Sequence, residues 1–197
     1  MDNQTNNQDC EGAEQVLFSV GEASRPPEEA QLAQSFRSGD EKGFLMAVQW
    51  FEGSLRRQAV AYLGNRQAAE DAVQETFLRA FCARTTLKGD RVFPWLSKIL
   101  HNFCMDILRR QKVLHEASSC LFDFSEVESE KARAMSQVVE LLADLSPEDR
   151  ELLHLRVTEK LPYETLAEIT GLAVGTLRNR VSKLLRILRE RMTNDEL

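Results

Sequence analysis

The side chains best suited to chemistry lie near the carboxyl end of the chain, and they are cations and amides rather than nucleophiles. At about 100° per residue, the segment 175–192 forms an amphipathic helix with an apolar stripe and a basic side. Such side chains bind base edges in the major groove and the flanking phosphates of duplex DNA. The candidate base contacts are Thr176, Arg178, Asn179 and Lys183, and the candidate phosphate contacts are Arg180 and Arg186.

The segment just before this helix has the pattern of a helix-turn-helix. Pro162 opens a short helix, because its missing N–H would be unpaired in the first turn anyway. Gly171 ends that helix, since a residue without Cβ adopts the left-handed conformation of a tight turn. Ala167, Gly171 and Leu177 then have helix-turn-helix spacing, which directs the start of the second helix into the major groove. A solvated basic face is the simpler alternative, and the two-helix pattern favours DNA contact.

A second basic stripe is predicted on a helix that begins at Pro94 and runs to about residue 112, next to a loop at 85–92. A surface for opened, single-stranded DNA needs cations together with polar or stacking groups. Phe93 and Trp95 offer stacking, or belong to the core. Cations at a helix carboxyl end also favour the helix dipole, which is a purely structural explanation. The candidate residues on this helix are Lys98, Asn102, Arg109 and Arg110.

A third face is acidic and belongs to a helix that begins at Asn65. Its other side carries the small and apolar residues of a core-facing stripe. A polar face usually means solvent, but acids beside an exposed leucine also fit a charged protein partner. The candidate protein contacts are Asp71, Gln74, Glu75 and Leu78.

Composition limits the classes of protein. The 197 residues are 43% hydrophobic and 28% charged, as in a soluble globular protein of one large or two small domains. The net charge of −6 comes from the amino-terminal part, whereas residues 175–192 hold six cations against one acid. No apolar run approaches the about 20 residues of a membrane span, and no secretory signal is present, so we expect a cytoplasmic protein without membrane insertion.

Enzymatic and metal chemistry find little support. The four cysteines are scattered without a CxxC pair, so we expect free thiols and no metal site. No P-loop, HExxH or GxSxG motif occurs, so we predict no enzyme, no catalytic residues and no cofactor.

The predicted fold class is all-α, with two small helical domains joined by an acidic linker. Ser146 and Pro147 start a helix of the second domain as N-cap and first residue. The expected division is an acidic extension at 1–27, a helical domain at 28–112, the linker at 113–134 and a helix-turn-helix domain at 135–197.

Three motifs in order resemble the extracytoplasmic-function (ECF) group of bacterial RNA polymerase sigma factors. They are AEDAVQETFLRAF (69–81), FPWLSKILHNFCMDILRRQ (93–111) and LSPEDRELLHLRVTEKLPYETLAEITGLAVGTLRNRVSKLLRILRERM (145–192). The resemblance covers about residues 28–192. It departs from the family pattern in the longer acidic extension, in Leu177 where valine is more usual, and in Asn179 where serine is common.

The resemblance implies an alternative sigma factor that directs core RNA polymerase to promoters. Residues 28–112 would be sigma region 2, whose helix 65–83 binds the polymerase clamp helices through Asp71, Gln74 and Glu75. The helix 94–112 would capture the melted minus-10 strand, and region 4 would contact the minus-35 element. The linker would run toward the RNA exit path, and an anti-sigma partner is expected. A helix-turn-helix regulator that binds DNA as a dimer remains the alternative.

Overall fold

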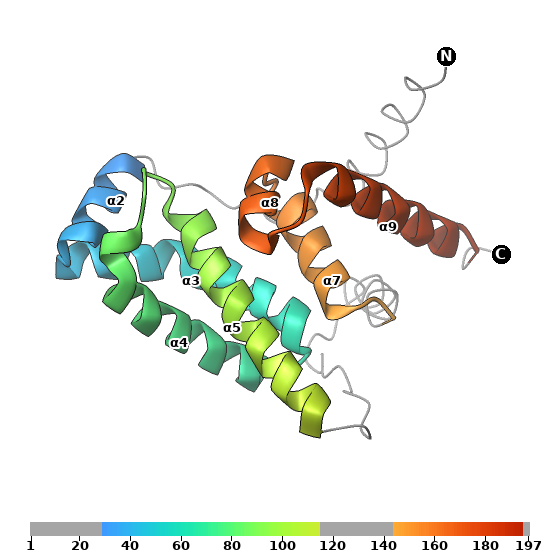
Figure 1. Cartoon of the computed structure of the whole chain (residues 1–197), viewed down its shortest axis with the longest axis horizontal. Coiled ribbons are helices and arrows are strands. Elements are labelled where there is room, and N and C mark those ends of the chain that lie inside the picture. Colours follow the sequence, from blue (N-terminus) through green and yellow to red (C-terminus); the bar gives the residue numbers. More distant parts are fainter. Residues whose placement is uncertain (1–28, 115–143, 195–197) are drawn as a thin grey trace, which may run out of the picture. The chain divides into compact units, whose positions relative to one another are not determined.

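A computed structural model describes residues 29–114 and 144–194 of the chain (Figure 1). Its regular elements in these two ranges are all helical, which confirms the predicted all-α class. They form two compact units, one built around α2 to α5 and the other around α7 to α9. The predicted extension at 1–27 and nearly all of the predicted linker lie outside the described residues.

The first unit begins with the helical hairpin of α2 (Glu29–Ser38) and α3 (Glu41–Leu63). The predicted break at 38–40 is present, because Gly39 adopts a positive φ of 78° and Asp40 caps α3. A hydrogen bond from the Ser35 hydroxyl lowers the pKa of the Asp40 carboxyl, which also accepts from the Lys42 N–H. The two helices cross at Gly43, where an added Cβ would lie 2.6 Å from the Ser35 carbonyl carbon.

Helix α4 (Arg66–Ala83) follows Asn65, whose side chain accepts from the Ala68 N–H at 2.9 Å as the N-cap. A short turn η1 (Arg84–Thr86) leads toward α5 (Val92–Leu114). Helix α5 therefore starts two residues before the predicted Pro94. The predicted core stripe of α4 is buried, as expected from its small and apolar side chains: Ala69, Ala72, Val73, Thr76, Phe77 and Ala80.

Helix α3 packs against α2, α4 and α5, and aromatic side chains fill the space between them. The ring of Trp95 meets Phe36 edge-on at 5.9 Å, and Phe93 lies 5.7 Å from Phe51. Phe93 is buried and belongs to the core, whereas Trp95 is only partly buried. A buried polar pair also joins α3 to α5, since the Ser97 hydroxyl donates to the Gln58 side chain at 2.9 Å.

The second unit consists of α7 (Pro147–Leu153), the π-helical turn η2 (His154–Thr158), α8 (Tyr163–Thr170) and α9 (Val174–Asn194). Ser146 caps α7, as predicted. Gly171 ends α8 with a φ of 75°, and its N–H donates to the Ala167 carbonyl at 2.9 Å. This is the predicted helix-turn-helix, in which α9 is the second helix. Its buried side is built from Leu177, Val181, Leu184, Leu185 and Leu188.

Candidate nucleic-acid and protein interfaces

Helix α9 presents its basic side to solvent. Leu177 is fully buried and anchors the first turn of the helix against the rest of the second unit. An α-helix completes one turn every 3.6 residues, so its apolar residues form one stripe. Burial of the leucine stripe of α9 therefore leaves the opposite side of the helix accessible to the major groove of DNA. The predicted duplex contacts Thr176, Arg178, Asn179, Lys183 and Arg186 are all exposed.

Arg180 differs from the other candidates on α9, because it is committed to an ion pair within the unit. Its Nε donates to Asp149 Oδ1 at 2.5 Å, and the side chain of Asp149 is only 19% exposed. The other oxygen of that carboxylate accepts from the Ser146 hydroxyl at 2.8 Å. Arg180 thereby ties α9 to the start of α7, a role that helical periodicity does not reveal.

The candidate face of α5 is also exposed where the sequence placed it. Leu96, Leu100 and Cys104 are buried on the other side of the helix. His101 turns toward the core, since its Nδ1 lies 2.5 Å from the Tyr62 hydroxyl. The predicted single-strand contacts Lys98, Asn102, Arg109 and Arg110 are all exposed, and Arg109 lies 3.4 Å from the carboxylate of Asp106.

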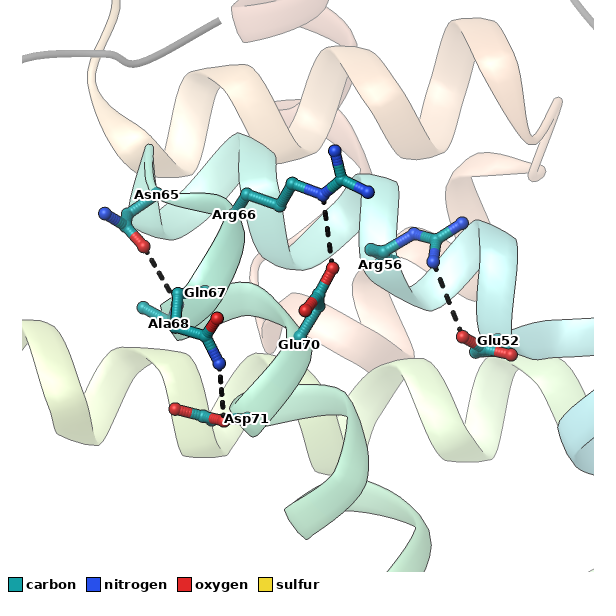
Figure 2. A network of polar contacts seen from close by, with 8 residues as sticks. All are labelled: Glu52, Arg56, Asn65, Arg66, Gln67, Ala68, Glu70 and Asp71. Atoms are coloured by element: carbon teal, nitrogen blue, oxygen red, sulfur yellow. Dashed lines mark hydrogen bonds and ion pairs between the residues drawn. The ribbon is translucent and has the colours of Figure 1, made fainter. Parts of the chain in front are cut away.

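Ion pairs and hydrogen bonds one helical turn apart organise the acidic face of α4. Figure 2 shows Arg66 paired with Glu70 at 3.2 Å and the Gln67 amide donating to Asp71 at 3.4 Å. Farther along, Arg79 pairs with Glu75 at 2.6 Å. Pairs of this kind stabilise a helix by a few tenths of a kcal/mol and leave the carboxylates in water. The acids therefore remain available to a partner.

Leu78 makes this face suited to protein contact rather than to solvent alone. Its side chain is 62% exposed, next to the exposed ring of Phe81. Among the predicted contacts, Asp71, Gln74 and Leu78 are exposed, and Glu75 is partly exposed. An apolar centre with charged neighbours is the usual composition of a protein interface.

The sequence analysis missed exposed apolar side chains on α3, namely Leu45, Met46 and Trp50. They lie on a different side of α3 from the buried residues Phe51 and Leu55. Their positions on a helical wheel could therefore have identified them as exposed. Among the described residues, no group of three or more potential metal ligands occurs. Neither Cys82 nor Cys104 forms a disulfide. The described helices include none with the length and apolarity of a membrane span.

Comparison with known proteins identifies the family of this chain. The family model for Sigma-70 region 2 matches residues 48–113, and the model for Sigma-70 region 4 matches residues 135–188. The ECF RNA polymerase sigma factor EcfG of Rhodopseudomonas palustris is 34% identical over 134 residues, which cover 66% of this chain and 74% of that protein. The chain belongs to the ECF family of RNA polymerase sigma factors.

Another relative and a solved structure each match most of this sigma factor. The RNA polymerase sigma factor SigV of Bacillus subtilis is 29% identical over 142 residues, which cover 72% of this chain and 86% of that protein. The solved structure of CnrH, in complex with the cytosolic domain of CnrY, has a TM-score of 0.64 at 24% identity. It covers 85% of this chain and 98% of the other. This second likeness concerns the fold alone.

Proposed function

We propose that this sigma factor binds core RNA polymerase and directs it to promoters, with separate helices for duplex DNA, opened DNA and polymerase. The observation that carries the proposal is the exposure of three chemically different faces, on α9, α5 and α4. Each face lies opposite a buried apolar stripe, so the fold holds it rigidly. We assign residues 28–112 to region 2, 113–134 to the linker and 135–197 to region 4, after an acidic extension at 1–27.

The face of α9 is proposed to contact the minus-35 element as duplex. The amino-terminal part of a second helix in a helix-turn-helix lies in the major groove, where arginine binds guanine and asparagine binds adenine. Arg178 and Asn179 lie in that part of α9, and Lys183 and Arg186 follow one and two turns later.

The face of α5 is proposed to bind the melted minus-10 strand. Unstacking a base costs a few kcal/mol, and contacts made only with the opened base repay part of that cost. Asn102 offers hydrogen bonds to a base edge, while Lys98, Arg109 and Arg110 attract the strand's phosphates. Opening thereby depends on sequence without a separate source of energy.

The face of α4 is proposed to bind the polymerase itself, through Asp71, Gln74, Glu75 and Leu78. The acids would meet a basic surface, and Leu78 would fill an apolar depression in it. We also propose regulation by an anti-sigma factor, because the RpoE structure from Bartonella quintana, which resembles this chain with a TM-score of 0.63, holds the anti-sigma factor NepR. The site of action is the cytoplasm, and the sigma factor itself is not an enzyme.

Reconstitution of the full chain with bacterial core polymerase tests the proposal. We expect the protein to copurify with core, and the holoenzyme to start transcripts at a defined set of promoters on genomic DNA. Sequencing of the transcript ends gives the shared upstream elements. A protein that fails to bind core, yet binds duplex DNA alone as a symmetric dimer, would instead be a helix-turn-helix regulator.

A further inference from the structure

Arg178, an exposed arginine in the first turns of α9, lies against two residues of α8. Its guanidinium carbon is 5.5 Å from the centre of the Tyr163 ring. Its Nη2 is also 3.9 Å from a carboxylate oxygen of Glu164. The two neighbours are the first two residues of α8. The two helices of the helix-turn-helix are therefore joined through the side chain that we propose contacts a base.

The Tyr163 ring has a second cation beside it. The guanidinium carbon of Arg156, from the turn η2, lies 4.8 Å from the ring centre. Arg156 also donates from Nη1 to the Leu161 carbonyl at 3.4 Å. Tyr163 itself is partly buried. The partly buried ring thus contacts Arg156 of its own unit as well as Arg178.

The ring and the carboxylate act differently on Arg178 once DNA is present. Both members of the ion pair are well exposed, Arg178 at 61% and Glu164 at 68%, so water and salt screen their attraction. The carboxylate also competes with a base for the same N–H donors. An aromatic ring attracts the cation through its face, and the donors at the guanidinium edge remain available for the two acceptors of guanine.

Holding a long side chain in its bound arrangement before the ligand arrives raises affinity, because less conformational freedom is lost on binding. We propose that Tyr163 is a positioning residue for sequence recognition, one that orients Arg178 toward a guanine of the minus-35 element. This inference rests on the proposed function of α9. It adds a residue of α8, outside the predicted contact set, to the determinants of promoter choice.

A double-mutant cycle in the holoenzyme tests the proposal. Each protein is the full chain bound to core polymerase, and each selects promoters from a pool randomised at the minus-35 element. The four proteins are wild type, Tyr163→Leu, Arg178→Ala and the double variant. We expect Arg178→Ala to abolish the preference at one position. Tyr163→Leu should weaken the preference at that same position by about two- to five-fold. In the Arg178→Ala background it should add nothing, because the two residues act as one unit.

Two further variants separate positioning from folding. Tyr163→Phe keeps the ring and should retain the wild-type preference. Tyr163→Trp should sharpen it, because indole binds cations more strongly than phenol does, and this variant serves even if Tyr163→Leu does not fold.

Three results would overturn the inference: an unchanged preference in Tyr163→Leu, an equal loss at every position, or a Tyr163→Leu effect that persists fully without Arg178. A wild-type holoenzyme that shows no sequence preference at the minus-35 element would instead refute the proposed function of α9. The wild-type selection alone gives this result, before any variant is compared.

Discussion

Two arginines two positions apart on α9 have different neighbours, and this difference separates recognition from architecture. Arg178 is exposed and lies beside α8, whereas Arg180 is bound to the Asp149 carboxylate of α7. That carboxylate also accepts from Ser146, the N-cap of α7. The network therefore couples the position of α9 to the start of α7, and residue type alone does not distinguish the two arginines.

We predict that Arg180→Ala lowers the unfolding free energy of the second unit by about 1–2 kcal/mol, because a partly buried charged hydrogen bond is lost. Amide hydrogen exchange in α7 and α9 of the full chain measures the change. The matched control is Arg186→Ala, an exposed arginine with only a 3.9 Å pair to Glu190. It should change stability by no more than about 0.5 kcal/mol. Equal losses in the two variants would show that the pair with Asp149 contributes nothing.

At the scale of the elements, the hairpin of α2 and α3 depends on a close approach at Gly43. The nearest atoms to an added Cβ are the carbonyl carbon and Cβ of Ser35 and the backbone N of Phe36, at 2.6 to 2.8 Å. Backbone cannot move aside as a flexible side chain does, so the two helices would have to separate. Phe36, which α2 contributes to the core, would move with them.

We predict that Gly43→Ala destabilises the first unit by about 1–3 kcal/mol through this overpacking. Gly53→Ala on the same helix is the control, because its Cβ would meet only the tip of Arg57 at 3.6 Å. That variant should be stabilised by about 0.5–1 kcal/mol, the usual gain of alanine over glycine inside a helix. Thermal unfolding of both variants gives the comparison. The explanation fails if the two alanines change stability in the same direction.

Helix α5 carries the next prediction, since its exposed face is assigned to opened DNA. Asn102→Ala should reduce the population of open complexes by about five-fold, if one hydrogen bond worth about 1 kcal/mol is lost. Closed-complex binding should remain as in wild type, because the base is still paired there. Permanganate reactivity of thymines in the melted region measures opening.

Gln111→Ala is the matched control for Asn102→Ala, because it removes an exposed amide nine residues later, on the opposite side of α5. It should leave opening unchanged. Wild-type permanganate reactivity in Asn102→Ala would remove this asparagine from the proposed surface.

For the whole molecule, local signals predicted most of the fold. The helix start at Asn65, the cap at Ser146 and the turn at Gly171 all occur, because each depends on backbone geometry within a few residues. The buried stripe of α9 likewise follows from the 3.6-residue period of one helix. Sequence reasoning succeeded wherever one element determined the outcome.

Contacts between elements account for what was missed. The bond from Arg180 to Asp149 spans 31 residues, and the contact between Tyr62 and His101 spans 39. A helical wheel places His101 on the basic stripe of α5, but it cannot show that α3 offers it a hydroxyl. The support of Arg178 by Tyr163 was missed for the same reason, since it depends on how α8 and α9 cross.

The last prediction concerns the assembly with polymerase. Asp71→Arg on α4 should weaken binding to core by about tenfold or more, because a like charge then faces the basic surface proposed there. The substitution lies at an exposed position, so helix content and unfolding temperature should not change. Competition between labelled wild type and each variant for a limited amount of core measures the affinity.

The control must make the same change in net charge, because the field of the whole molecule also steers association. Glu52→Arg does so at an exposed site on α3, where the acid pairs with Arg56 at 3.5 Å (Figure 2). If steering by net charge were the only effect, the two reversals would weaken binding equally. A loss confined to Asp71→Arg would place the contact on α4, whereas full competition by this variant would remove α4 from the polymerase interface.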